Sequence, residues 1–240
     1  MNGVAVVVGA GGGIGAALVR RLADDARYAR VLALSRTATP EAAPRVVQGR
    51  LDLLDEASIA AAAAQASELG GVRLVIVATG VLHDAAGMRP EKQWGALDAA
   101  TLARAFAVNA TGPALVARHF LPLLPRTGRS AFAALSARVG SIEDNRAGGW
   151  YAYRASKAAL NMLIRTFSIE LARRAPEAVC VGLHPGTVDT GLSRPFQGNV
   201  PAGRLSTPDH SAACLLRVLD GLEPADSGRV FAWDGQRIPA

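Results

Sequence analysis

The sequence predicts an α/β fold: a Rossmann-like, doubly wound, seven-stranded parallel sheet with helices on both faces. Two observations favour this class. Short runs of β-branched residues alternate with longer Ala- and Leu-rich segments, and each run is apolar at consecutive positions. Strands of a parallel sheet are buried on both faces, so they lack the polar alternation of a half-exposed strand. The length of 240 residues and the 50% of hydrophobic residues suit one domain, residues 1–240, with a sizeable core.

The order of the elements supports this class. Strands are predicted at Val4–Val8, Arg30–Leu34, Val46–Gly49, Leu74–Ala78, Ser130–Leu135, Val179–Leu183 and Arg229–Ala232. Helices are predicted at Ile14–Asp25, Glu56–Leu69, Ala99–Leu124, Tyr151–Arg174 and Ser206–Leu222. Strands that alternate with helices in this way form parallel sheets with right-handed crossovers.

Two segments near the end of the chain are not expected to be regular. The stretch Pro185–Gly203 is rich in Gly, Pro, Ser and Thr and follows a strand. We therefore expect residues 187–205 to form a mobile loop over a substrate site. The last residues, "WDGQRIPA", are expected to be a turn and a tail.

Composition and charge exclude several classes of function. The formal net charge is +6, but 24 of the 26 basic residues are scattered arginines, so we expect no nucleic-acid partner. No apolar run reaches the roughly 18 residues of a membrane span, and no basic segment or cleavage site precedes the first strand. The two cysteines, Cys180 and Cys214, suffice for neither a disulfide framework nor a metal site. We expect buried thiols, no metal and a cytoplasmic location.

A glycine-rich turn follows the first predicted strand. Gly9, Gly13 and Gly15 form a G-x-x-x-G-x-G pattern, and Gly11 and Gly12 lie within it. Glycines let the backbone approach a pyrophosphate closely. The helix beginning at Ile14 then offers unpaired N–H groups and a positive dipole end to the phosphates. This strand–turn–helix context predicts a dinucleotide-binding domain.

The ends of the second and third strands indicate which dinucleotide binds. Ser35 and Arg36 stand where an NAD site usually carries a carboxylate for the ribose 2′-hydroxyl. A guanidinium instead suits a 2′-phosphate, so we favour NADP(H) over NAD, although Arg36 is one arginine among many in this chain. Asp52 either caps the next helix or contacts the adenine.

Tyr153 and Lys157 are four residues apart in "YAYRASKAALN". Positions i and i+4 share one face of a helix, so the phenol and the ammonium should point the same way. An unperturbed phenol has a pKa of about 10 and is a poor base at neutral pH. A neighbouring ammonium favours the phenolate, so we expect Lys157 to lower the pKa of Tyr153.

Together, the glycine pattern, Asn109 in "FAVNATGP", the Tyr153/Lys157 pair and "HPGTVDT" resemble the short-chain dehydrogenase/reductase family over essentially the whole chain. The stretch "SARVGSIEDNRAGGWYAYRASKAALN" is similar, more narrowly, to the C-factor and sniffer-type carbonyl reductases. The resemblance implies that Tyr153 is the general acid or base and that Lys157 also binds the nicotinamide ribose. It implies that Asn109 holds a water linking Lys157 to solvent; an interhelix hydrogen bond is the alternative.

The chain departs from the family pattern at two places. The family's serine that binds the substrate oxygen falls on Ala137, so we choose Ser136 for that role, with Ser141 as the alternative. "VATGVLH" replaces the usual Asn-Ala-Gly stretch. The resemblance implies that the cofactor site also includes Leu53, Ala78, Thr79, Gly80, Pro185, Gly186, Val188 and Thr190.

The predicted function is hydride transfer between NADP(H) and a small-molecule carbonyl or secondary alcohol. The alternative is a cofactor-binding regulatory or signalling protein with little turnover, which the absent serine keeps open. A sugar-nucleotide epimerase usually needs a longer chain. Trp150, Leu192 and Phe196 suggest an apolar substrate portion or are ordinary packing residues. Family members often pair through the long helices 99–124 and 151–174, so a homodimer or homotetramer is expected.

Overall fold

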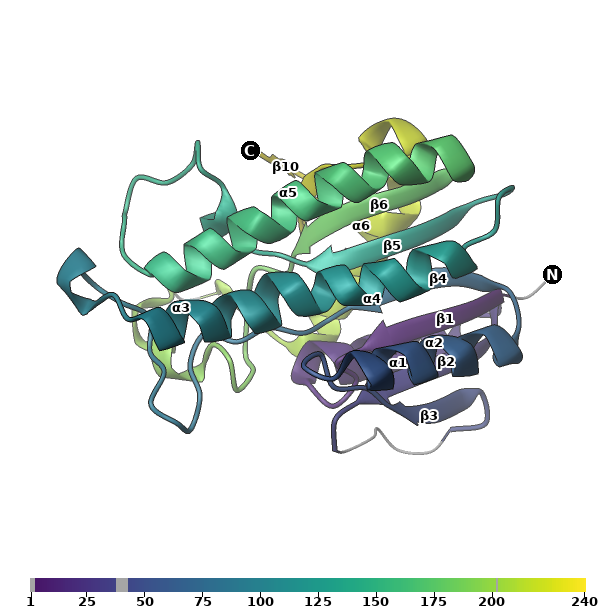
Figure 1. Ribbon diagram of the computed structural model, residues 1–240, viewed down its shortest axis with the longest axis horizontal. Helices are drawn as coiled ribbons and strands as arrows, with labels where there is room; N and C mark the ends of the chain where they lie inside the picture. Colours follow the sequence, from purple (N-terminus) through teal and green to yellow (C-terminus); the bar gives the residue numbers. More distant parts are fainter. Residues whose placement is uncertain (1–2, 38–42, 202) are drawn as a thin grey trace.

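An eight-stranded sheet runs through the computed structural model, which describes residues 3–37, 43–201 and 203–240 (Figure 1). Its strand order is β10-β9-β6-β5-β4-β1-β2-β3. The strands are β1 (Gly3–Val8), β2 (Tyr28–Ser35), β3 (Val46–Arg50), β4 (Val72–Val77), β5 (Ser130–Leu135), β6 (Ala178–His184), β9 (Val230–Ala232) and β10 (Arg237–Ile238). The chain winds outward in both directions from β1 and β4. In such sheets, ligands bind beyond the carboxyl ends of the strands at this switch point.

The seven predicted strands pair in parallel, as expected for a doubly wound fold. The eighth strand corrects the expectation of a simple tail. Arg237 and Ile238 pair antiparallel with Phe231 and Val230. The turn between them is made by Gly235, whose φ of 87° is readily adopted only without a side chain.

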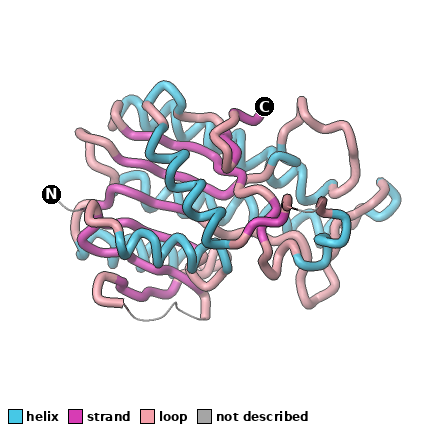
Figure 2. Tube along the Cα trace, turned by 180° about the vertical axis from the view of Figure 1, so that it is seen from behind, coloured by secondary structure: helices cyan, strands magenta, loops and turns pink. Residues whose placement is uncertain are grey.

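Two hydrophobic cores lie on opposite faces of the sheet. Val4, Val6 and Val8 of β1 face one core, and Ala5 and Val7 face the other, as the pleat of a strand requires. Helices α2 (Glu56–Leu69), α4 (Gly112–Phe120) and α5 (Tyr151–Arg174) cover the first face. Helices α1 (Gly13–Asp24) and α6 (Pro208–Gly221) cover the second, which Figure 2 shows from behind. The expected burial of the sheet on both faces is therefore confirmed.

The predicted helix 99–124 is interrupted in the structure. It consists of α3 (Ala99–Phe106), a π-helical turn (Ala107–Thr111), α4 and a short 3₁₀ turn (Leu121–Leu123). Pro113 explains the interruption, because it has no N–H to donate to the carbonyl of Asn109 four residues earlier. The sequence interpretation treated the segment as one helix and missed this effect. The π-helical turn contains Asn109, and such turns are frequent at functional sites.

The segment after β6 folds back over the carboxyl edge of the sheet. It contains β7 (Thr187–Val188), which pairs in parallel with β8 (Leu205–Ser206), and a 3₁₀ segment at Arg194–Asn199. Ser206, predicted to begin a helix, lies in β8, and Thr207 caps α6 by accepting a hydrogen bond from the His210 N–H. The predicted mobility of residues 187–205 stays a prediction.

Among the described residues, no helix is both long and apolar enough to cross a bilayer. The same part of the chain holds no group of three or more His, Cys, Asp or Glu side chains placed to bind a metal ion.

Candidate functional site

Two adjoining cavities, of about 480 and 410 Å³, open at the carboxyl ends of β1 and β4. They share a wall made of Gly11, Gly12, Ala78, Thr79 and Gly80. The shared wall makes them two halves of one elongated cleft. The switch point of the sheet is where such a cleft is expected.

Most of the predicted site residues border this cleft. The first cavity is bordered by Gly9, Gly11, Gly12, Ser35, Arg36, Asp52, Leu53, Ala78, Thr79 and Gly80. The second adds Gly13, Ile14, Ser136, Tyr153, Lys157, Pro185 and Thr190. Four predicted residues do not border either cavity. Gly15 packs beneath the glycine turn, Gly186 lies against Trp233, and Val188 and Asn109 are buried.

The glycine turn brings α1 up to the cleft. Gly9 has a φ of 91°, and a Cβ there would lie 2.7 Å from the carbonyl oxygen of Ala78. A Cβ at Gly15 would lie 2.1 Å from the carbonyl oxygen of Gly9. Only glycines therefore allow β1, β4 and α1 to approach so closely. The first N–H groups of α1 have no partner within the helix, and Gly12, Gly13 and Ile14 present this end to the cleft.

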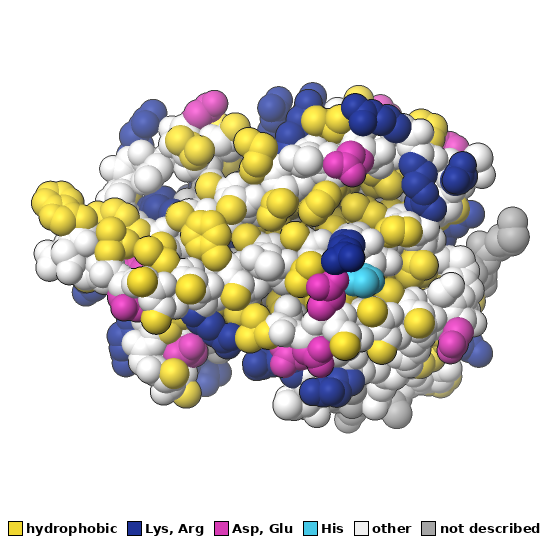
Figure 3. All heavy atoms as spheres, viewed as in Figure 1, with side chains coloured by type: hydrophobic (Ala, Val, Ile, Leu, Met, Phe, Trp, Pro, Cys, Tyr) yellow, Lys and Arg dark blue, Asp and Glu magenta, His cyan; other side chains and the backbone are white. Residues whose placement is uncertain are grey.

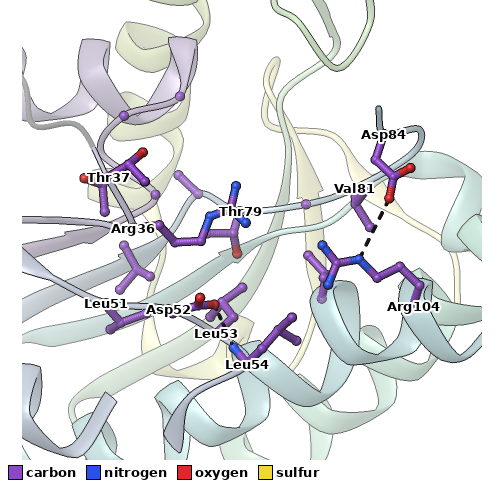
Figure 4. A pocket seen from close by; sticks show the side chains of 18 of the residues that line it. Arg36, Thr37, Leu51, Asp52, Leu53, Leu54, Thr79, Val81, Asp84 and Arg104 are labelled. Atoms are coloured by element: carbon purple, nitrogen blue, oxygen red, sulfur yellow. Dashed lines mark hydrogen bonds and ion pairs between the residues drawn. The ribbon is translucent and has the colours of Figure 1, made fainter. Parts of the chain in front are cut away.

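Arg36 and Arg104 lie on opposite sides of the first cavity, with Thr79 between them (Figure 4). Arg36 follows β2. Arg104 comes from α3 and lies 4.0 Å from the carboxylate of Asp84. The Thr79 hydroxyl is buried, and the described residues offer it no hydrogen-bond partner. A buried polar group of this kind is suited to a ligand that brings the missing partner.

Asp52 also borders the first cavity, and its carboxylate accepts a hydrogen bond from the N–H of Leu54. The cap of α2 is instead Asp55, which accepts from the N–H groups of Ala57 and Ser58. Of the two alternatives for Asp52, capping the helix is therefore wrong.

Tyr153 and Lys157 lie side by side in the second cavity. Lys157 Nζ is 5.9 Å from the centre of the Tyr153 ring, which confirms that both side chains lie on one face of α5. Lys157 Nζ donates a hydrogen bond of 2.7 Å to the carbonyl of Leu135, at the end of β5. Glu91, also buried, fixes the start of α5, because its carboxylate accepts from the Ala152 N–H and its carbonyl from the Trp150 N–H.

Burial controls the charge of this pair. It raises the pKa of Tyr153 to about 12 and lowers the pKa of Lys157 to about 8. The expectation that Lys157 lowers the pKa of Tyr153 is wrong for this structure, because burial removes hydration from the phenolate and raises the pKa instead. Tyr153 is therefore a neutral phenol at neutral pH, which suits a proton donor.

Asn109 is fully buried and bridges two segments. Its Oδ1 accepts from the N–H of Val81, and its Nδ2 donates to the carbonyl of Val81 and to Ser156 Oγ of α5. A Cβ at Gly80 would lie 3.5 Å from Asn109 Oδ1 and 3.7 Å from Lys157 Nζ. Asn109 thus joins the loop after β4 to α5 beside Lys157, and the interhelix hydrogen bond is present.

The two candidate serines lie in different places. Ser136 borders the second cavity, but its hydroxyl donates to Asn161 Oδ1 at 2.6 Å. This geometry does not support Ser136 as a donor to a substrate oxygen. Ser141 borders neither cavity; its hydroxyl donates to the carbonyl of Ala240. Ala137 packs against Tyr153 and Leu82.

Sequence reasoning missed several residues of the cleft. The first cavity also includes Thr37, Leu51, Leu54, Val81, His83, Asp84, Arg104 and Val108. The second includes Leu135 and Gly191, together with Leu192, which the sequence analysis had already suggested for an apolar substrate portion. Most of these follow the ends of β2, β3, β4, β5 or β6, where extending each motif by a few residues would have found them. Arg104 and Val108 lie on a helix, and their i, i+4 spacing was the only signal.

Comparison with known proteins gives consistent matches. Residues 3–200 match the model of the short chain dehydrogenase family. The chain is 34% identical over 230 residues to 1-hydroxy-2-glutathionyl-2-methyl-3-butene dehydrogenase of Rhodococcus sp. (strain AD45), which covers 96% of each protein. It is 43% identical over 145 residues to the C-signal of Myxococcus xanthus, covering 60% of this chain and 82% of that protein.

Two solved structures are similar over their whole length. The NADPH-bound carbonyl reductase from chicken fatty liver superposes with a TM-score of 0.84 at 28% identity, covering 100% of this chain and 99% of that one. The carbonyl reductase Sniffer of D. melanogaster has the same TM-score at 22% identity and covers 100% of both chains, which is a likeness of fold alone.

Lys157 should make the free energy of unfolding rise with pH above about pH 8. Its pKa of about 8 lies below its ordinary value of 10.5, so between these values the unfolded chain holds a proton that the folded chain has lost. Stability therefore rises through this window, by roughly 1.4 kcal/mol per pH unit at most. Urea denaturation measures the free energy of unfolding of the wild type and of Lys157→Met. The difference between the two should change between about pH 8 and pH 10.5 and stay constant below pH 8.

The exposed lysine of the chain, Lys92, provides the matched control. Lys92→Met makes the same substitution outside the cleft and measures the effect of losing an exposed lysine. A pH-independent difference between the wild type and Lys157→Met would contradict the prediction.

Proposed function

Since the chain belongs to the short chain dehydrogenase family and is an oxidoreductase of that family, we propose that it transfers a hydride between NADP(H) and a carbonyl or secondary alcohol. The observation that carries the proposal is the buried Tyr153/Lys157 pair in a cavity that continues into the glycine turn. The phenol would exchange a proton with the substrate oxygen while the nicotinamide exchanges a hydride with its carbon.

The residues around the cleft fit NADP(H). The start of α1, with Gly13 and Ile14, would bind the diphosphate through N–H groups that have no partner within the helix. Thr79 has a buried hydroxyl that a ribose or phosphate oxygen would satisfy. Arg36, with Ser35, would bind the 2′-phosphate. The similar chicken reductase binds NADPH, which supports the assignment.

The remaining predicted residues would hold the nicotinamide half. Pro185 and Thr190 border the second cavity and would lie along the ring. Gly186 and Val188 would act through the backbone that positions these two residues. Lys157, whose ammonium is held by Leu135, would bind the nicotinamide ribose.

Tyr153 would act as the general acid in reduction. With a pKa of about 12, its hydroxyl carries a proton at neutral pH and can donate it to the developing alkoxide. Lys157 would stabilise the phenolate that remains, since opposite charges attract strongly in a buried site. Asn109, beside Lys157 at Gly80, would hold the water that returns a proton from solvent.

The exposed face of α4 and α5 supports a homodimer or homotetramer. Figure 3 shows hydrophobic side chains gathered over these helices. On α5, Met162 is 66% exposed and Ile169 is 44% exposed. Burying such side chains against a second copy would stabilise an assembly.

Cys180 and Cys214 are buried free thiols, which supports a reducing, cytoplasmic location. Recovery of the protein from an oxidising compartment of its source cells would contradict this location.

Replacing Tyr153 by Phe should strongly reduce turnover without loss of cofactor binding. We expect kcat/KM to fall by roughly 10²- to 10⁴-fold, because the substrate oxygen loses its proton donor. The measurement follows NADPH oxidation with a panel of aldehydes, ketones and diketones. Tyr151→Phe, two residues away on α5, is the matched control and should remain active. Saturable NADPH binding by the wild type, with no turnover on any member of the panel, would favour the regulatory alternative.

Replacing Arg36 by Ala should weaken NADPH binding about 10- to 100-fold and leave NADH binding unchanged, because only NADPH carries the 2′-phosphate. Titration of both cofactors, followed by fluorescence, measures the two affinities. Arg50→Ala removes an exposed arginine that borders neither cavity and should change neither affinity. An unchanged ratio of affinities in Arg36→Ala would show that another group binds the phosphate.

Replacing both Met162 and Ile169 by Glu should dissociate the assembly, because buried charges cannot be hydrated. Sedimentation velocity should give a dimer or tetramer of the 24.8 kDa chain for the wild type and a monomer for the variant. A monomeric wild type would rule out this interface.

A further inference from the structure

The wall beside Tyr153 is built from apolar side chains. Leu82 and Ala137 are buried against Tyr153, and Val139, Trp150, Leu192 and Phe196 pack around them. The Trp150 ring lies edge-on to Tyr153, with centres 6.2 Å apart, and packs against Phe196 at 5.3 Å. Besides the phenol, the side chains of this cluster carry one N–H, the indole of Trp150, and no hydroxyl.

Ser136, the residue before Ala137, points its hydroxyl proton away from these apolar side chains. A hydroxyl has one proton, and that of Ser136 goes to Asn161 Oδ1. The orientation of the Asn161 amide follows from its other bond, because Nδ2 donates to the carbonyl of Gly140 at 3.4 Å. Asn161 therefore presents an acceptor to Ser136.

The consequence concerns the charge that forms on a carbonyl oxygen during reduction. The carbon accepts a hydride from NADPH, which becomes NADP⁺. The electron pair of the C=O π bond moves to the oxygen, which takes the Tyr153 proton, so the product is an alcohol. Each further hydrogen-bond donor at such an oxygen typically accelerates the reaction by about 10²- to 10³-fold. At position 137, where the family pattern has a serine, the methyl group of Ala137 stands in place of such a donor.

Building on the proposed function, we infer that Ala137 sets the substrate class: the enzyme reduces carbonyls that are already electrophilic and flanked by apolar groups. Electron-poor aromatic aldehydes and 1,2-diketones belong to this class. Their carbonyl carbons accept a hydride with less help from the protein, so one donor, Tyr153, suffices. Simple ketones need the second donor and should be poor substrates. Leu192, which borders the second cavity, and the Trp150 and Phe196 rings in the same apolar cluster suit the flanking apolar group.

A series of para-substituted benzaldehydes, from nitro to methoxy, tests this inference with the full-length protein and NADPH. The quantity compared is kcat/KM, because product release does not enter it. We expect kcat/KM to fall steeply as the substituent becomes electron-donating. Ala137→Ser places a hydroxyl beside Tyr153. It should raise kcat/KM about 10-fold or more for the electron-rich members and less for the electron-poor ones, which flattens the slope.

The controls separate this effect from general changes. Ala64→Ser makes the same substitution at an exposed position of α2 and should leave the slope as in the wild type. If Ala137→Ser does not fold, the slope of the wild type alone decides, since a flat profile would overturn the inference. A 10²-fold loss in Ser136→Ala or Trp150→Phe would also overturn it, because either result would reveal a second donor.

Failure of the inference and failure of the proposed function give different results. Turnover with a flat slope would leave the proposed function standing and refute the role of Ala137. The absence of turnover with every aldehyde, ketone and diketone would refute both.

Discussion

The hydrogen bond from Lys157 to the carbonyl of Leu135 ties the long helix α5 to the carboxyl end of β5, and the site is arranged around this contact. Lys157 is almost completely buried, so its ammonium loses hydration that one carbonyl only partly replaces. The same burial keeps Tyr153 protonated. Burying both groups lowers the stability of the folded chain. It also creates a site in which a neutral phenol and a readily titrated amine lie one helical turn apart.

The supports of this arrangement come from several elements. Glu91 holds the first turn of α5, Asn109 joins α5 to the loop after β4, and Asn161 joins it to the loop after β5. Each is a side chain that bonds to backbone or to another side chain across a packed interface. These three contacts fix the height and the rotation of α5 relative to the sheet, and hence where the Tyr153 hydroxyl lies.

Much of the fold could be predicted because its signals are local. Continuous apolar runs such as Val4–Val8 identify strands of a parallel sheet, and the glycine turn identifies the start of α1. The family resemblance, which the comparisons confirm, supplied the pairing of distant motifs. The π-helical turn and β10 were missed because each depends on one or two residues, Pro113 and Gly235, whose effect a periodicity argument averages away. The orientation of the Ser136 hydroxyl and the effect of burial on Tyr153 depend on tertiary packing, which no linear pattern contains.

The shared wall of the two cavities also affects how tightly a long ligand binds. Gly11, Gly12, Ala78, Thr79 and Gly80 border both halves, so a molecule that fills one half already places its other end at the mouth of the second. The second contact is then intramolecular, at an effective concentration of roughly millimolar or higher. Either half of the ligand alone would bind weakly, and their covalent linkage would provide most of the affinity. Such bivalent recognition lets the chain bind a dinucleotide tightly although each separate contact is weak. The reacted cofactor can then dissociate one end at a time.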